Sequence, residues 1–431
     1  MPKYSIILPT LNSVQYLPNC VETIVSQDYD DYELIISNNC SDDETAAYLK
    51  TLTGDTHIKV IRPKERLVLG EHWNFAISHA TGEWIYGIGS DDGVMPFFFN
   101  LLDKLTHIAD SKNLNIIKTN RVYYFWEGLK EIYGDSYINF SAKANVRILS
   151  CKKMLCEVLY ENPNKFFDIP QMYTTSVFRK DVLQKAKCNR MNKIIQDDMA
   201  HDTYLGLLGC IYENEYLYSD IPIGWVGSSP TSIGSNIKEF KQEGMFQNIK
   251  DFIANNPEAY YERYHFVELA LKVDSLLLVR AILYFMKGGY DIVIPSALDI
   301  TEHTNLVKVY ACVYKIISNL DDQKLKDERM FFLDDMLAHK GINKDEIILI
   351  SKNIANKKTT FSELLRKVVY KVNRALNKIL HITNFSQKEF SIIQNYGNIN
   401  NFKNMCEVNK FLAVNESILE MLDLIGCGYG R

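Results

Sequence analysis

The sequence predicts an α/β fold in which a sheet flanked by helices fills the first half of the chain and a mainly helical domain fills the second. In the first hundred residues, short apolar runs alternate with segments of helical spacing. From about Ile237 onward, helical patterns dominate and β-branched alternation is rare. The length of 431 residues also exceeds what one hydrophobic core usually serves. We therefore expect two domains, over residues 1–235 and 236–431.

The first part of the chain has the pattern of βαβ units. Its apolar runs predict strands, and the intervening segments predict helices. Such units are right-handed and form a parallel sheet, whose ligands bind beyond the carboxyl ends of the strands. The expected strands are Tyr4–Leu8, Tyr32–Ile36, Ile58–Ile61 and Glu83–Ile88, and the expected helices are Tyr16–Ser26, Asp42–Leu52 and Gly70–His79.

The regular alternation ends at Asp92. Beyond it we expect strands at Val122–Phe125, Lys130–Tyr133 and Thr174–Phe178, and helices near Val182–Lys187 and Thr203–Tyr212.

Composition excludes several classes of protein. A net charge of -5 gives no overall attraction to nucleic acid. The nine cysteines lack the close spacing of a zinc or redox motif, so free thiols in a reducing cytosol are expected. The N-terminus has no signal-peptide pattern, and the longest apolar runs are too short to span a bilayer. We expect a cytoplasmic protein.

Four stretches of the N-terminal third form a pattern, in this order: Ser5–Asn12, Tyr32–Asp42, Gly70–Asn74 with Ala80–Ile85, and Ser90–Asp92. Their order and spacing resemble the family 2 inverting glycosyltransferases of GT-A fold, and Thr174–Leu183 and the region of Asp202 extend the resemblance to about residue 226. The resemblance implies a GT-A-type Rossmann-like mixed sheet flanked by helices. It also implies metal-dependent transfer of a sugar from a nucleotide-sugar donor, a UDP-sugar first of all, to an acceptor hydroxyl. Synthesis of a bacterial-type surface polysaccharide or glycoconjugate is the expected setting.

Asp91 and Asp92 follow the fourth apolar run, where a metal site is expected. A nucleoside diphosphate leaving group concentrates negative charge, and Mn²⁺ or Mg²⁺ bound by carboxylate oxygens neutralises it. The resemblance makes Asp92 the first candidate for metal ligand, and Asp91 a ribose contact or second ligand. Many relatives have a further Asp at the position of Gly89. The alternative for the Asp pair is a turn and helix cap before Gly93.

The loops after the first three strands supply the candidate nucleotide contacts. Pro9, Thr10 and Asn12 follow the first strand and approach the nucleotide. Asn38 stands where the family usually has an Asp that bonds the uracil ring, so the identity of the base stays open. Arg66 follows the third strand and is a candidate for the base or the diphosphate, with a solvated loop arginine as the alternative.

An inverting transferase also needs a general base for the acceptor hydroxyl. The resemblance assigns this role to Asp202, in the stretch Ala200–Leu205, with His201 replacing the usual acidic neighbour. Asp197 and Asp198 are the nearest rivals. A helix N-cap is the alternative role for Asp202.

Residues 361–382 form a basic amphipathic pattern. Apolar residues recur at helical spacing among five basic residues and one acid. One interpretation is a helix that lies on an anionic membrane, here its inner face, and brings the active site to a glycan or lipid-linked glycan acceptor. The alternative is a helix whose apolar face covers the core of its own domain.

Two other functions compete with the transferase. A sugar nucleotidyltransferase would need a glycine-rich loop after the first strand, and Leu8–Ser13 contains no glycine. A catalytically silent binding or scaffold protein on the same fold is kept open by Asn38, Gly89 and His201.

Overall fold

The structure is a computed structural model, and its two compact units are Met1–Gly244 with Met286–Leu298 and Glu389–Arg431, and Met245–Phe285 with Asp299–Lys388. The predicted helix at 361–382, the predicted strand at Lys130–Tyr133, and Asp197 and Asp198 lie outside the described residues. Those residues are 1–127, 137–156, 167–185, 194–195, 201–230, 232, 303–320, 322–353, 389–395 and 404–427.

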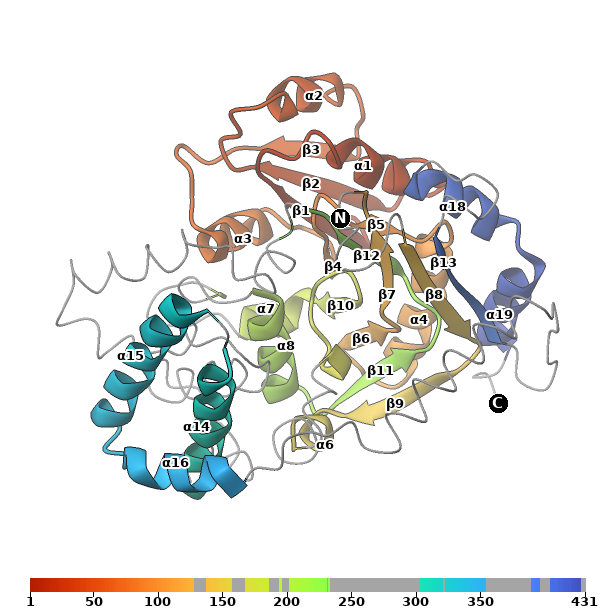
Figure 1. Cartoon of the computed structure of the whole chain (residues 1–431). Coiled ribbons are helices and arrows are strands. Elements are labelled where there is room, and N and C mark those ends of the chain that lie inside the picture. The colour runs from red at the N-terminus through yellow and green to blue at the C-terminus, as the bar shows by residue number, and fades with distance from the viewer. Residues whose placement is uncertain are drawn as a thin grey trace. The chain divides into compact units, whose positions relative to one another are not determined.

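An eight-stranded mixed sheet forms the centre of the first unit (Figure 1). Its order is β3-β2-β1-β4-β10-β6-β11-β9; β10 and β9 are antiparallel to their neighbours and the other strands are parallel. The mixed α/β sheet expected of the fold is therefore confirmed. The strands are β1 (Tyr4–Thr10), β2 (Tyr32–Asn38), β3 (Ile58–Ile61), β4 (Trp84–Gly87), β6 (Ile116–Thr119), β9 (Val146–Ser150), β10 (Ser176–Arg179) and β11 (Glu215–Ser219).

Five helices of the first half, α1, α2, α3, α7 and α8, lie within a few residues of their predicted ranges, whereas α4 and α6 were not predicted. Strand β1 is buried almost throughout, as expected of an inner parallel strand covered on both faces. Helix α1 has a proline in its first turn, where the missing N–H costs nothing. The helices are α1 (Leu17–Val25), α2 (Thr45–Thr51), α3 (Leu69–Ser78), α4 (Phe98–Ser111), α6 (Cys151–Cys156), α7 (Lys180–Lys185) and α8 (His201–Tyr212).

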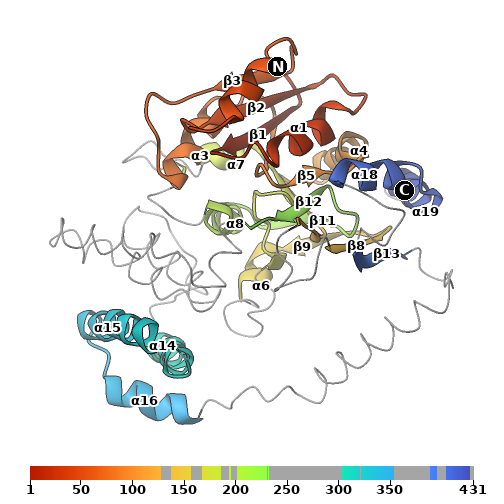
Figure 2. The same cartoon turned by 45° about the horizontal axis from the view of Figure 1, so that its top comes forward.

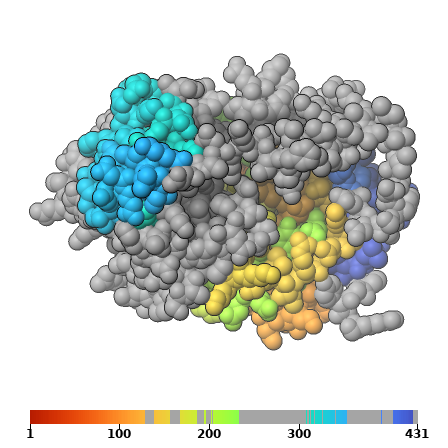
Figure 3. Space-filling model, turned by 60° about the horizontal axis from the view of Figure 1, so that its bottom comes forward, coloured from red at the N-terminus to blue at the C-terminus, as the bar shows by residue number. Residues whose placement is uncertain are grey.

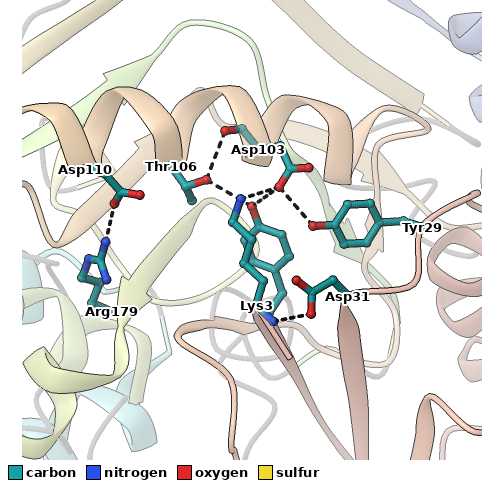
Figure 4. A network of polar contacts seen from close by, with 8 residues as sticks. Lys3, Tyr29, Asp31, Asp103, Thr106, Asp110 and Arg179 are labelled. Atoms are coloured by element: carbon teal, nitrogen blue, oxygen red, sulfur yellow. Dashed lines mark hydrogen bonds and ion pairs between the residues drawn. The ribbon is translucent and has the colours of Figure 1, made fainter. Parts of the chain in front are cut away.

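A polar network joins α4 to the amino ends of the strands, at the edge opposite the candidate site (Figure 4). One oxygen of Asp103 receives hydrogen bonds from Lys3 Nζ at 2.6 Å, Tyr4 at 2.8 Å and Tyr29 at 3.0 Å. Further along α4, Asp110 pairs with Arg179 of β10. These contacts fix α4 on the sheet that it covers.

A second sheet of five strands has the order β13-β8-β7-β12-β5. Strand β7 agrees with its predicted range, whereas the other four strands were not predicted. They are β5 (Gly93–Val94), β7 (Val122–Phe125), β8 (Tyr137–Lys143), β12 (Gly224–Ser228) and β13 (Glu389–Asn395). Figure 3 shows a face on which the yellow segment that includes β8 and the edge strand β9 reaches the surface beside green residues of 201–230.

The C-terminal segment belongs to the first unit rather than to the helical one. Strand β13 pairs along its length with β8. Helix α18 (Met405–Ala413) contacts α1, and α19 (Glu416–Cys427) contacts α4, as Figures 1 and 2 both show. The division at residue 235 stays a prediction, but the segment 389–431 clusters with the sheets.

The second unit contains α14 (His303–Ser318), α15 (Gln323–His339) and α16 (Lys344–Asn353), which share a hydrophobic core of their own. The helical character expected of this region agrees with these three elements. In the part of the chain that the structure describes, no helix is long and apolar enough to cross a membrane.

Candidate active site

Asp92 lies at the carboxyl end of β4 and is fully buried. Its Oδ2 accepts hydrogen bonds from the Gly89 amide at 2.8 Å and the Thr174 hydroxyl at 3.1 Å. Its Oδ1 accepts one from the Gly227 amide of β12 at 2.7 Å. Three separate segments of the chain therefore converge on one carboxylate.

Burial and the neighbouring Asp91 raise the pKa of Asp92 to about 7, against hydrogen bonds that lower it. Burial also raises the pKa of Asp91. Two adjacent carboxylates with raised pKa values form a site in which a positive charge would stabilise the ionised forms.

Asp91 is only half-buried and is held differently. Its Oδ2 accepts a hydrogen bond from Ser229 at 2.8 Å and another from Ser232. Its backbone carbonyl accepts one from the Trp126 indole at 2.7 Å. No partner of its Oδ1 is found among the described residues, so this oxygen remains open to a ligand.

Thr174 has a strained backbone at this site. Its φ is 55°, in the left-handed region that a β-branched residue rarely adopts. Its amide donates to the Gly87 carbonyl at 2.7 Å and its carbonyl accepts from Tyr86 at 2.8 Å, so both sides of the residue are fixed. The strain holds the Thr174 hydroxyl on Asp92, as expected where function requires an unfavourable conformation.

Tyr173 connects the Asp pair to the start of α8. Its hydroxyl is hydrogen-bonded to Asp92, and burial together with the charges of Asp92, Asp91 and Asp202 raises its pKa. A Cβ atom at Gly89 would lie 2.4 Å from that hydroxyl. The absence of a side chain at Gly89 therefore leaves the space that Tyr173 fills.

Asp202, the candidate base, lies in the first turn of α8 and within electrostatic range of Tyr173. The neighbouring His201 ring stacks on Trp73 of α3 at 4.3 Å and meets Tyr173 edge-on at 5.3 Å. Burial lowers the pKa of His201 to about 4, so the imidazole is neutral near pH 7. The Asp pair and Asp202 thus all act electrostatically on Tyr173.

The candidate nucleotide residues of β1 and β2 are neighbours in the sheet. Thr10 pairs directly with Asn38, as Pro9 does with Ser37, and both Thr10 and Asn38 are buried. The Thr10 hydroxyl is hydrogen-bonded to Ser13, and the Asn38 side-chain oxygen accepts from the Ser41 amide at 2.9 Å. Asn38 therefore uses its carbonyl oxygen to shape its own loop.

Asn12 and Arg66 meet through Asp42. Arg66 pairs with the Asp42 carboxylate at 3.0 Å and donates to the Cys40 carbonyl at 3.1 Å, while the Asn12 side chain accepts from the Asp42 amide at 2.9 Å. Hydrogen bonds from Arg66 lower the pKa of Asp42. These exposed loops extend the site from β1 toward β3.

Residues 5–181 match the family model described as glycosyl transferase family 2. This part of the chain is a family 2 glycosyltransferase domain. A biosynthesis glycosyltransferase for PGL/p-HBAD from Mycobacterium bovis is 33% identical over 95 residues, which is 22% of this chain and 37% of the relative. The glycosyltransferase GlyG of Streptococcus pneumoniae is 27% identical over 121 residues, 28% of this chain and 39% of the relative. The matches span little more than a third of these relatives.

Among solved structures, S. aureus TarS 1-349 in complex with UDP-GlcNAc has a TM-score of 0.42 and 13% identity, over 79% of this chain and 90% of that one. The mannosyltransferase PcManGT from Pyrobaculum calidifontis, in complex with GDP-Man and Mn²⁺, has a TM-score of 0.37 and 15% identity, over 79% and 86%.

Helix α18 supports the Asp loop of the glycosyltransferase domain from behind. The side chain of Asn409 donates to the Val94 carbonyl at 2.8 Å and accepts from the Trp225 indole at 2.9 Å, which ties β5 to β12. Met405 lies against Gly93, where an added Cβ would come within 2.2 Å of its sulfur. Residues more than 300 positions away thus complete the loop that follows the Asp pair.

The described residues could supply only a few protein ligands to a divalent cation. Among the described residues, no group of three or more His, Cys, Asp or Glu side chains could hold a metal ion. The adjacent carboxylates of Asp91 and Asp92 do fit, because Mg²⁺ is commonly held by one or two carboxylates together with substrate phosphates and water.

Sequence reasoning missed Tyr173, Ser229, Gly227 and Asn409. Thr174 opens one of the stretches that carry the family resemblance, but no pattern indicated that its hydroxyl binds Asp92. The other residues reach the site only through the fold. The roles assigned to Pro9, Thr10, Asn12, Asn38, Arg66, Asp91, Asp92 and Asp202 stay predictions.

Proposed function

We propose that this chain is an inverting, metal-dependent glycosyltransferase that moves a sugar from a nucleotide-sugar donor to an acceptor hydroxyl. The observation that carries the proposal is the Asp91–Asp92 pair after β4, in which Asp92 is fully buried. Tyr173 is hydrogen-bonded to Asp92 and lies within electrostatic range of Asp202. The family 2 domain over residues 5–181 supports the same activity. A surface polysaccharide or glycoconjugate is the proposed product, in line with the biosynthetic names of relatives.

In the proposed reaction, Asp91 and Asp92 would hold Mn²⁺ or Mg²⁺. The cation, when bound, would neutralise the charge of the departing diphosphate. Pro9, Thr10 and Asn12, together with Asn38 and Arg66, border the nucleotide, for which a UDP-sugar is the first candidate. The side-chain oxygen of Asn38 accepts a hydrogen bond from the Ser41 amide. The side-chain NH2 group of Asn38, or backbone atoms, would therefore recognise the base.

Asp202 is the proposed general base. The acceptor oxygen forms a bond to the anomeric carbon while the bond between that carbon and the diphosphate oxygen breaks, and the hydroxyl proton passes to the Asp202 carboxylate. A carboxylate suffices because the hydroxyl becomes acidic only as the new bond forms. His201, fixed between Trp73 and Tyr173, is neutral near pH 7 and adds no positive charge beside Asp202.

The test of the base uses Asp202→Asn. We expect nucleotide binding with Mn²⁺ to stay near the wild-type value, while turnover falls by roughly 10²–10⁴-fold, the usual share of general-base catalysis. Slow hydrolysis of UDP-sugars and GDP-sugars measures turnover without a known acceptor. Asp198→Asn is the matched control, and loss of turnover in that variant alone would move the base assignment to Asp198.

The same assay separates the enzyme from the silent scaffold. A wild-type chain that binds no nucleotide sugar with Mn²⁺ by calorimetry, and hydrolyses none, is the result expected of the scaffold. Attachment to membranes through residues 361–382, near a lipid-linked acceptor, is proposed from the sequence pattern alone. Co-sedimentation with anionic liposomes at low and high salt tests it, because electrostatic attachment weakens as salt rises.

A further inference from the structure

Arg121 is held in one orientation at the carboxyl end of β6. Its guanidinium lies 4.6 Å from the ring centre of Phe167 and 5.5 Å from that of Tyr123. Its Nη1 donates to the side-chain oxygen of Gln171 at 3.1 Å, and Gln171 is fully buried. Two aromatic faces and one amide thus fix a planar group whose shape suits carboxylate or phosphate oxygens.

Two buried donor atoms at Arg121 and Gln171 have no acceptor among the described residues. Among the described residues, Arg121 Nε and Gln171 Nε2 are buried without a hydrogen-bond partner, and no carboxylate forms an ion pair with Arg121. Lys118 lies on β6, three residues before Arg121, and is 1% exposed. Its Nζ donates a hydrogen bond to the Thr175 hydroxyl at 2.9 Å. Burial and the nearby Arg121 charge lower the pKa of Lys118 to about 7, against the charge of Asp168, which raises it. Unpaired buried donors are costly, and an anion would satisfy them.

The order of strands separates this cluster from the donor diphosphate. Strand β6 runs parallel to β4, so Arg121 and the Asp pair share the carboxyl edge of the sheet. One strand, β10, lies between them, which at about 4.8 Å per strand gives roughly 10 Å. The candidate nucleotide residues lie on the other side of β4, on β1 and β2. Arg121 is therefore on the side where the transferred sugar and the acceptor belong.

We propose that Arg121, oriented by Gln171, Phe167 and Tyr123, binds an anionic group, a phosphate or a carboxylate, carried by the glycan substrate. This inference rests on the proposed function for the identity of the substrate, but the anion site itself does not. It makes Arg121 a specificity residue that selects charged over neutral glycans, separate from the Asp pair that faces the diphosphate.

The experiment measures binding of glycerol 3-phosphate, glucuronate and neutral glucose to the full chain by saturation-transfer NMR. We expect both anions to bind at least about tenfold more tightly than glucose, and Arg121→Gln to abolish that preference. Arg121→Lys keeps the charge but loses the fork, so it should restore the preference only in part. Equal binding of anions and glucose to the wild type would overturn the proposal.

Arg179→Gln is the matched control. Arg179 also stacks on an aromatic ring, Trp84 at 4.6 Å, but it lies at the amino end of β4. We expect this variant to keep the anion preference, and equal losses in both glutamine variants would indicate a general charge effect and overturn the proposal. Calorimetry with UDP-glucuronate and UDP-glucose assigns the source of the anion. If Arg121→Gln weakens the binding of UDP-glucuronate alone, the anionic group belongs to the donor sugar. If it weakens the binding of glycerol 3-phosphate alone, the anionic group belongs to the acceptor.

The same samples distinguish this inference from the proposed function. If the wild type prefers anions through Arg121 but binds no nucleotide with Mn²⁺, the transferase proposal fails and the anion site stands. If nucleotide binding is intact and the anion preference is absent, only the Arg121 inference fails.

Discussion

Replacing Gly227 by alanine tests whether β12 supports the Asp pair as closely as the structure indicates. A Cβ atom at Gly227 would lie 1.7 Å from the backbone oxygen of Asp91, whereas real Cβ contacts stay above 3.0 Å. The two segments must therefore separate by at least 1.3 Å, the difference between these distances. Both are backbone, so no flexible side chain can absorb the shift.

Two losses set the magnitude. Overpacking of a closely packed site typically costs about 1–3 kcal/mol. Separation also breaks the hydrogen bond from the Gly227 amide to Asp92, and hydrogen bonds to charged groups contribute about 1.5–3 kcal/mol. Since the two effects overlap, we expect Gly227→Ala to lower the free energy of unfolding by roughly 2–5 kcal/mol. Mn²⁺-dependent nucleotide binding should weaken as well.

Urea unfolding followed by tryptophan fluorescence measures the stability, and calorimetry measures the binding. Gly54→Ala is the control, because a Cβ there meets nothing within 4 Å. We expect that variant to match the wild type in both measurements. A Gly227→Ala protein as stable as Gly54→Ala, with unchanged nucleotide affinity, would refute the close approach of β12 to the Asp pair.

Two further predictions concern the same loop. The pKa of Asp92 is about 7 in the folded chain and 3.8 as a free side chain. Its carboxyl therefore contributes a stability that is fully present below about pH 4 and is lost as pH rises to about 7. Asp92→Asn should flatten this slope in metal-free thermal unfolding at a series of pH values. Asn409→Leu leaves the Trp225 indole and the Val94 carbonyl unpaired, so amide exchange in β5 and β12 should rise more than in Leu412→Ala, a core truncation of the same helix.

Strands β1, β2 and β4 could be predicted because they are buried on both faces. Such strands are continuous apolar runs, and Tyr4–Leu8 is visible in the sequence without any partner. The segment Glu389–Asn395 is different. Its pairing with β8 joins residues about 250 positions apart, and a seven-residue segment with three apolar side chains carries little local signal. The second sheet depends on such distant pairings, so its edge strand was missed.

The candidate site divides in the same way. Asp91 and Asp92 could be singled out because they follow a strand, and the carboxyl end of a parallel strand is where ligands bind. Gly227 and Asn409 act through one amide proton and one carboxamide, at positions 135 and 317 residues after Asp92. Nothing in their local sequence indicates this. Only the three-dimensional arrangement reveals them.

The glycine at position 89, where many relatives have an aspartate, changes the charge of the site. An aspartate at position 89 would add a third carboxylate to two whose pKa values are already raised, and its Cβ would overlap the Tyr173 hydroxyl. With glycine there, a neutral hydroxyl occupies the space and is hydrogen-bonded to Asp92. The metal-free site then carries less repulsion, and it offers fewer anionic ligands to a cation. We therefore expect the donor's phosphates to complete the metal site, so that cation and nucleotide bind together rather than in sequence.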